Sequence, residues 1–132
     1  MDRKIAHITL VVKNYDEAID FYVNKLNFNL IKDTILDQNK RWVLVSPNLE
    51  QSCNLLLAEA ANDIQNNAIG NQSGGRVFLF LYTDNFKRDF QGLLDNKIKI
   101  VREPKSEPYG DVAVFEDLYG NLWDLIEPKN KN

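Results

Sequence analysis

The chain contains only one cysteine, Cys53, and only one histidine, His7. A single cysteine excludes an internal disulfide and any zinc site built from cysteines. The apolar runs are far shorter than a membrane span, and the N-terminus lacks the apolar region of a signal peptide. Lys and Arg are scattered along a chain of formal net charge −3, without the basic stripe that nucleic-acid binding requires. These absences predict a soluble, cytoplasmic protein that binds neither nucleic acid nor membranes.

The composition is that of one globular domain. The chain has 132 residues, of which 44% are hydrophobic and 27% charged. This length is sufficient for a core, and this hydrophobic content is too high for a disordered chain. We therefore expect a single domain over residues 1–132.

Hydrophobic periodicity predicts two similar series of elements. The first series is a strand, a helix that begins at Asn14 and three strands, the strands at residues 5–12, 29–36, 41–46 and 54–58. Asn14 and Glu17 have the spacing of a capping box. Residues 59–75 lack periodicity and predict a linker with at most a short helical turn. The second series is a strand, a helix capped by Asp84 and three strands, the strands at residues 76–83, 99–103, 111–116 and 122–127.

The two series align when the chain is laid on itself with Asn14 on Asp84. At this uniform offset, Val43 falls on Ala113. The sequence therefore predicts a duplicated βαβββ unit, with repeat units at about 1–58 and 76–128 and a linker at 59–75. Each unit alone would bury little, so the two are expected to share a core or to fold their sheets around a common space.

Three segments carry a resemblance to a known family: "IAHITLVVKNYDEAIDFYVNKLNF", "GGRVFLFLYTDNF" and "EPYGDVAVFEDLYGNLWDLIEP". Together they resemble the vicinal oxygen chelate superfamily, which includes glyoxalase I, bleomycin-resistance proteins and extradiol dioxygenases. The last segment is similar to that family's Asp-Pro-x-Gly-Asn turn, with Leu118 in place of the proline. The resemblance implies an α+β fold in which two tandem βαβββ units form a half-open barrel around a cavity.

The resemblance also implies positions for a metal site. Metal-dependent members take one ligand from the first and last strand of each half, and the equivalent positions here are His7, Asn54, Val77 and Asp124. Val77 has no donor atom. His7, Asp124 and Asn54 thus form an incomplete set for a divalent ion such as Zn, Ni, Mn or Fe, with substrate or water completing the shell.

Other roles for these side chains remain open. A lone strand histidine is more often packed and hydrogen-bonded than a metal ligand, and His7 can also serve as an acid, a base or a hydrogen-bond donor to a ligand. Asp124 interrupts an apolar strand and needs a partner if it is buried. That partner is His7 in a pair without metal, or one of the arginines Arg41 and Arg76.

A second set of residues is predicted to bind a ligand. Aromatic side chains around a cavity suit a flat or cationic ligand, and a cation at the mouth suits an anionic group. The candidates are Trp42, Arg76, Phe78, Tyr109 and Trp123.

Three functions follow from these patterns. The favoured one is a small-molecule-binding protein of the bleomycin-resistance type, acting as a homodimer, in which no catalytic residue is assigned. The second is a divalent-metal-dependent lyase, isomerase or dioxygenase that uses His7 and Asp124. The third is a regulatory module whose cavity is filled by side chains. The metal content of the purified protein discriminates between the first two.

Overall fold

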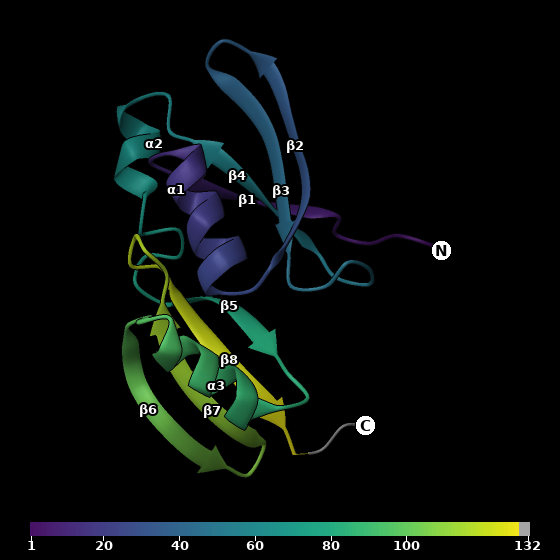
Figure 1. Cartoon of the computed structure of the whole chain (residues 1–132), viewed down its shortest axis with the longest axis vertical. Helices are drawn as coiled ribbons and strands as arrows, with labels where there is room; N and C mark the ends of the chain where they lie inside the picture. Colours follow the sequence, from purple (N-terminus) through teal and green to yellow (C-terminus); the bar gives the residue numbers. More distant parts are fainter. Residues whose placement is uncertain (130–132) are drawn as a thin grey trace. The chain divides into compact units, whose positions relative to one another are not determined.

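A computed structural model describes residues 1–129 of the chain, which divides into two compact units, Met1–Ile69 and Gly70–Asn132. Each unit is a four-stranded mixed sheet with a helix on one face (Figure 1). The predicted α+β class and the tandem βαβββ repeat are thereby confirmed. The single domain predicted over residues 1–132 stays a prediction, and residues 130–132 lie outside the described part.

Unit 1, Met1–Ile69, has the sheet order β1-β4-β3-β2, with β1 parallel to β4 and the other pairs antiparallel. Its strands are β1 (His7–Val12), β2 (Asn29–Asp37), β3 (Lys40–Ser46) and β4 (Asn54–Glu59). Its first helix is α1 (Tyr15–Ile19), which continues as the π-helix η1 (Asp20–Lys25). The predicted linker contains a further short helix, α2 (Asp63–Ala68).

Unit 2, Gly70–Asn132, repeats this arrangement with the sheet order β5-β8-β7-β6. Its strands are β5 (Val77–Tyr82), β6 (Ile100–Glu107), β7 (Gly110–Glu116) and β8 (Leu122–Pro128), and its helix is α3 (Phe86–Asp95). β6 was predicted to end at Glu103 but continues through Pro104. Since β6 is an edge strand with a register irregularity between Arg102 and Lys105, the missing proline N–H breaks no regular ladder.

The helix caps are where the residue types predict them, with one correction. The side-chain oxygen of Asn14 accepts a hydrogen bond from the N–H of Glu17 at 3.0 Å, which confirms the cap of α1. α3 is capped by Asn85, which accepts from the N–H of Arg88 at 3.1 Å. The prediction of Asp84 as this cap was wrong by one residue. Asp84 instead forms an ion pair with Arg88 at 3.3 Å.

No single offset aligns the whole repeat. The predicted offset holds in the middle strands, because Val43 pairs with Leu57 just as Ala113 pairs with Leu125. The same pairs make Leu57 the equivalent of Leu125 in the last strands, where the predicted offset would have placed it on Glu127. The last strands therefore align at a different sequence offset from the middle strands.

The first helices are displaced in the opposite direction. Their caps are Asn14 and Asn85, whereas the predicted offset placed Asn14 on Asp84. The first strands, β1 and β5, precede these helices, so their residues can be matched either from the caps or from their partners in the last strands.

Two local insertions in unit 1 account for these shifts. In η1 the N–H of Leu26 donates to the carbonyl of Phe21, five residues earlier, whereas at the end of α3 the N–H of Asn96 donates to Gly92, four residues earlier. The wider π-turn holds one extra residue. The connection between β3 and β4, residues 47–53, is longer than the turn at residues 117–121 that joins β7 to β8.

The core of each unit lies between the sheet and its helix. In unit 1 it contains fully buried side chains from the strands and the helix, among them Leu10, Val12, Tyr22, Val43, Val45 and Leu57. In unit 2 it contains Leu93, Ala113, Phe115, Trp123 and Leu125. Burying a large apolar side chain contributes about 1.5–3 kcal/mol, so these residues fix the helix on one face of each sheet.

The turn at residues 117–121 is held by buried polar groups. The carboxylate of Asp117 accepts hydrogen bonds from the N–H groups of Tyr119 and Asn121, and from the side-chain amide of Asn121, each at 2.9 Å. Asn121 in turn accepts from the N–H of Gln72 at 3.3 Å. These bonds close the turn although Leu118 stands where the family pattern has proline.

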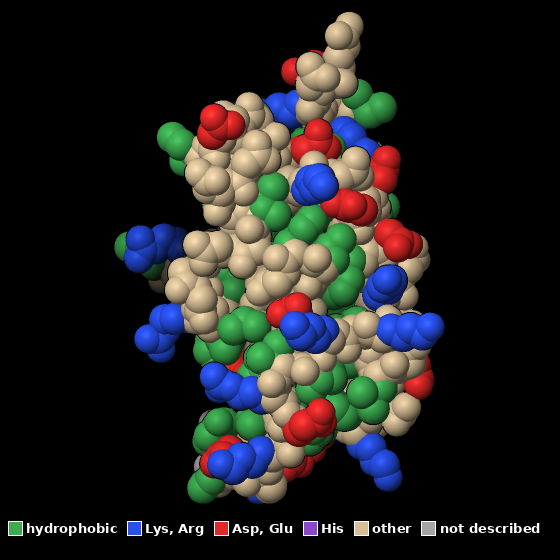
Figure 2. Space-filling model, turned by 90° about the vertical axis from the view of Figure 1, so that its left-hand side faces the viewer, with side chains coloured by type: hydrophobic (Ala, Val, Ile, Leu, Met, Phe, Trp, Pro, Cys, Tyr) green, Lys and Arg blue, Asp and Glu red, His purple; other side chains and the backbone are tan. Residues whose placement is uncertain are grey.

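Charges of both signs share the surface. On the face shown in Figure 2, Lys and Arg side chains lie beside Asp and Glu side chains, with hydrophobic groups between them. Within residues 1–129, no helix is long and apolar enough to cross a membrane.

Candidate functional site

Each sheet has two unlike faces, which follow from the alternation of side chains along a strand. One face carries the core and its helix. In unit 1 it includes Glu59, whose carboxylate accepts a hydrogen bond from the N–H of Tyr15, the first residue of α1. In unit 2 it includes Glu127, which accepts from the N–H of Phe86, the first residue of α3. We call the opposite face of each sheet its open face.

The open face of unit 1 brings together three residues singled out in the sequence. His7 and Asn54 are register partners on the parallel strands β1 and β4, and Asn54 Nδ2 lies 3.3 Å from His7 Nδ1. The imidazole also meets the indole of Trp42 on β3, edge to face, with ring centroids 6.0 Å apart. His7 is exposed, so this cluster is accessible in unit 1.

The open face of unit 2 carries Asp124 within a row of four register partners. The row runs across the sheet from Phe80 on β5 through Asp124 on β8 and Val114 on β7 to Arg102 on β6. Phe80 is 61% exposed, and Tyr82, two residues further along β5, is 69% exposed. An acidic, an aromatic and a basic side chain thus share one face.

The electrostatic environment of Asp124 follows from this row. Partial burial among its apolar neighbours raises the pKa of the Asp124 carboxyl, and the nearby charge of Arg102 opposes that rise. Asp124 is the acidic member of this row. Its strand neighbours Trp123 and Leu125 are buried on the helix face, which explains a carboxylate within an apolar strand.

The structure does not gather all the predicted ligand-binding residues. Trp123 is 3% exposed and stacks on Phe115 in the core of unit 2. Tyr109 lies in the turn between β6 and β7, and Arg76 precedes β5. Phe78 lies within the register irregularity between Val77 and Leu79.

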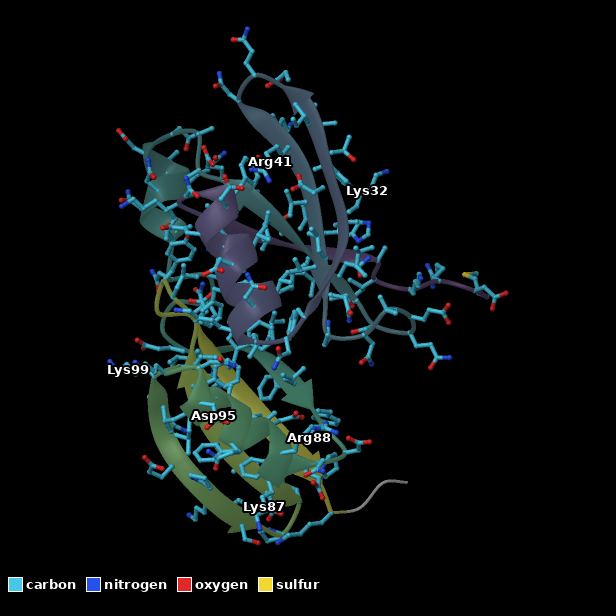
Figure 3. All side chains as sticks on the ribbon, in the orientation of Figure 1. Lys32, Arg41, Lys87, Arg88, Asp95 and Lys99 are labelled. Carbon is cyan, nitrogen blue, oxygen red and sulfur yellow. The ribbon has the colours of Figure 1, made fainter. Side chains whose placement is uncertain are left out.

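Arg41, one of the partners predicted for Asp124, is engaged inside unit 1. Its guanidinium donates to both carboxylate oxygens of Asp33, at 3.1 and 2.6 Å, and to Asp16 on α1 at 2.9 Å. It also lies 5.1 Å from the centroid of the Tyr15 ring. Figure 3 shows Arg41 on β3 beside α1. The basic residue whose charge reaches Asp124 is Arg102, which was not singled out from the sequence.

The four positions of the implied metal site can now be compared through the internal repeat. Leu56 pairs with Thr9 and Leu44, as Asp124 pairs with Phe80 and Val114, so Leu56 is the equivalent of Asp124.

Through the strand pairs, Val77 is the equivalent of His7, because Val77 pairs with Leu122 as His7 pairs with Asn54. Counted back from the helix caps the equivalent is Phe78, since the register irregularity of β5 lies between Val77 and Leu79. The assignment of Asn54 rested on the uniform offset and is shifted in register, because the strand pairs place Leu56 there. By either count the position equivalent to His7 carries a hydrocarbon side chain.

Two of the four positions thus carry hydrocarbon side chains, and the donor set does not fit a metal ion. Within residues 1–129 there is no group of three His, Cys, Asp or Glu side chains that could hold one. Metal binding by His7, Asp124 and Asn54 stays a prediction.

Three residues of the open face of unit 2 were missed from the sequence: Phe80, Tyr82 and Arg102. Phe80 and Tyr82 were not among the residues predicted to bind a ligand. Alternation along β5 could have placed them, had Phe80 been aligned with Asp124 in the parallel strand pair. The position of Arg102 on this face depends on the irregular register between β6 and β7, which the sequence does not reveal.

Comparisons with known proteins agree with this fold. A family model described as "Glyoxalase/Bleomycin resistance protein/Dioxygenase superfamily" matches residues 4–125. An uncharacterized protein of Shewanella frigidimarina (strain NCIMB 400) is 58% identical over 132 residues, which cover 99% of this chain and 98% of that protein.

Two solved structures are similar over nearly the whole chain. The crystal structure of UcmS2 has a TM-score of 0.83 at 26% identity, covering 96% of this chain and 99% of that one. The structure of TnmS3, an antibiotic binding protein from Streptomyces sp. CB03234, has a TM-score of 0.77 at 26% identity, covering 97% and 98%.

Proposed function

This chain belongs to the Glyoxalase/Bleomycin resistance protein/Dioxygenase superfamily, and from that premise we propose that it is a small-molecule-binding protein without a resident metal. The observation that carries the proposal is the open face of unit 2, where Phe80 and Tyr82 expose their rings on the strand beside Asp124. Exposed aromatic side chains around a single carboxylate suit a flat ligand with a positive group. The similarity to an antibiotic binding protein supports the same class of function.

The physical argument has two parts. The rings of Phe80 and Tyr82 offer apolar area that a flat ligand would remove from water, at about 25 cal/mol per Å². Asp124 then selects among flat ligands, because its carboxylate accepts hydrogen bonds from an ammonium or amidinium group. Arg102, at the far end of the row, disfavours a ligand whose positive charge extends along the whole face.

The ligand class is tested with two flat compounds of nearly equal area, 9-aminoacridine and acridine. We expect calorimetry on tag-free protein at neutral pH to show tighter binding of the cationic compound by about fivefold, equivalent to about 1 kcal/mol. The variant Asp124→Asn should remove this preference and keep acridine binding, while Phe80→Ser with Tyr82→Ser should weaken both compounds. Failure of both compounds to bind at millimolar concentration would refute the proposal.

The enzyme alternative is tested separately by metal content. Protein dialysed against trace zinc, nickel, manganese and iron should contain well below one ion per chain by plasma emission spectrometry. One ion per chain, lost in both His7→Ala and Asp124→Ala, would establish the metal-dependent enzyme instead.

We further infer that the protein is a homodimer. Each sheet ends in two edge strands, β1 and β2 in unit 1 and β5 and β6 in unit 2, and edge strands are commonly covered by a second chain. Light scattering coupled to sizing chromatography should give twice the mass of one chain, which is 15.3 kDa. A mass of one chain across micromolar concentrations would contradict the dimer.

A further inference from the structure

The open face of unit 1 has its own polar chemistry, which differs from that of Asp124 in unit 2. Its cluster consists of His7, Asn54 and Trp42. Leu56, the neighbour that corresponds to Asp124, is apolar. A ligand group that rests on this face therefore meets an imidazole, an amide and an indole, and no carboxylate from that position.

The contact between Asn54 and His7 determines which nitrogen of the imidazole carries the proton. The amide nitrogen of Asn54 can only donate a hydrogen bond, and the atom it faces at 3.3 Å is Nδ1 of His7. Nδ1 must then be the acceptor, which in a neutral imidazole leaves the proton on Nε2. The contact with Trp42 adds a second constraint, because the edge-to-face arrangement of the rings limits the orientation of the imidazole.

We propose that Asn54 is a positioning residue that holds His7 as the Nε2–H tautomer, so that the open face of unit 1 presents a hydrogen-bond donor beside Trp42. This face then selects a flat aromatic ligand that carries an acceptor atom, such as a ring carbonyl oxygen. The choice of ligand rests on the proposed small-molecule-binding function. The tautomer is a property of the free protein and is tested without any ligand.

The proposed role and metal ligation require different protonation of the ring nitrogen that faces the ligand. A metal ligand presents an unprotonated nitrogen to the ion. Here the unprotonated nitrogen, Nδ1, faces Asn54, and the nitrogen left for a ligand carries the proton. The cluster therefore binds acceptors rather than cations.

The tautomer is read directly by nitrogen-15 NMR, because His7 is the only histidine and its ring signals need no assignment. In the free protein at alkaline pH, we expect Nε2 to resonate as the protonated nitrogen and Nδ1 as the unprotonated one. The informative variant is Asn54→Asp, which has nearly the same shape but replaces the donor with an acceptor. It should move the ring proton to Nδ1.

Asn67→Asp is the matched control, since it introduces the same charge on the exposed helix α2. It should leave the wild-type pattern unchanged. A wild-type ring with the proton on Nδ1 would overturn the proposal. A proton that stays on Nε2 in a folded Asn54→Asp variant would overturn it as well, because Asn54 would then not control the ring.

The ligand is tested with 9-fluorenone and fluorene, which share one flat ring system and differ only in the carbonyl group. We expect the wild type to bind 9-fluorenone more tightly by about fivefold, and His7→Phe to bind the two equally. Equal binding in the wild type would overturn the acceptor selectivity. If neither compound nor any acridine binds, the proposed function fails, whereas the NMR spectra still decide whether Asn54 positions His7.

Discussion

The carboxylate of Glu127 near the end of β8 accepts a hydrogen bond of 2.7 Å from the N–H of Phe86, the first residue of α3. Unit 1 repeats the contact between Glu59, the last residue of β4, and the N–H of Tyr15 at 3.2 Å. The first N–H groups of a helix have no partner within the helix and carry a partial positive charge. In both units, therefore, an acid at or near the end of the last strand accepts a hydrogen bond from the first N–H of the helix packed on that sheet.

This relationship predicts the effect of removing either acid. Glu127→Ala should lower the free energy of unfolding by about 1–2 kcal/mol, because the N–H of Phe86 loses a charged acceptor in a partly buried position. Glu59→Ala should cost less, since its hydrogen bond is longer. Urea unfolding measures both changes, with Glu103→Ala on the exposed strand β6 as the control. Equal stability of Glu127→Ala and the control would show that the contact contributes nothing.

A second prediction concerns Arg41, which ties the hairpin of β2 and β3 to α1. Its planar group donates to two oxygens of Asp33 and one of Asp16, a geometry that a lysine ammonium cannot reproduce. Arg41→Lys should therefore destabilise the protein by about 1 kcal/mol, although the charge is kept. Arg88→Lys is the matched control, because Arg88 is 61% exposed and its ion pairs lie in water. Arg88 also donates to both carboxylate oxygens of Asp89, so the two variants differ in the exposure of the contact. A loss of the same size in both would show that the partly buried position of Arg41 adds nothing to its contact.

The sequence was sufficient to predict the repeat because each element carries a local signal. Apolar alternation marks the strands, and Asn14 caps the first helix as its position before an acidic turn predicts. The cap of α3 was displaced by one residue, from Asp84 to Asn85, because both residue types cap helices equally well. Local propensity does not distinguish between two adjacent candidates.

The register of the outer strands could not be predicted in the same way. It depends on one residue absorbed in η1, which has no recognised sequence signal, and on a longer connection before β4. The sequence shows that this connection is longer than its counterpart, but not how many residues of β4 are shifted. A shift of one or two residues changes which side chains are compared between the halves. This is why Asp124 was matched with Asn54, when the strand pairs match it with Leu56. The contact of His7 with Trp42 is likewise a product of the sheet, since these residues lie on non-adjacent strands.

A third prediction compares two glycines of unit 2, one without space for a side chain and one with space for it. Gly70 has a φ of 74°, and a Cβ there would overlap the carbonyl oxygen of Tyr119 in the turn before β8. Gly70→Ala should destabilise the protein by at least about 2 kcal/mol, from backbone strain together with this overlap.

Gly92 lies inside α3, and a Cβ there would meet no described atom within 4 Å apart from its chain neighbours and the backbone of its own helix. Gly92→Ala should instead stabilise the protein by about 0.5–1 kcal/mol, because alanine loses less backbone entropy on folding. Thermal unfolding of the two variants compares them directly. A stable Gly70→Ala variant would show that the turn can move away from residue 70.

The last prediction is a pH dependence that arises from Asp124. Burial raises the pKa of its carboxyl above the ordinary value of 3.8, so the folded protein holds this proton at pH values where the unfolded chain has released it. Stability then falls as the pH rises through this window, because the unfolded state binds fewer protons there. The contribution of the carboxyl to stability is fully present below pH 3.8 and is lost as the pH passes the raised value.

Asp124→Asn removes this dependence, because the amide does not ionise. The variant should match the wild type in strongly acidic solution and become the more stable of the two as the pH approaches neutrality. Urea unfolding across this pH range measures the difference, with Asp2→Asn near the N-terminus as the control. Arg102→Gln should steepen the dependence, since the charge that favours the ionised carboxylate is removed. A wild type that gains stability over Asp124→Asn as the pH rises would mean that the ionised carboxylate has a stabilising partner, and that the open face of unit 2 is less able to recognise a cationic ligand.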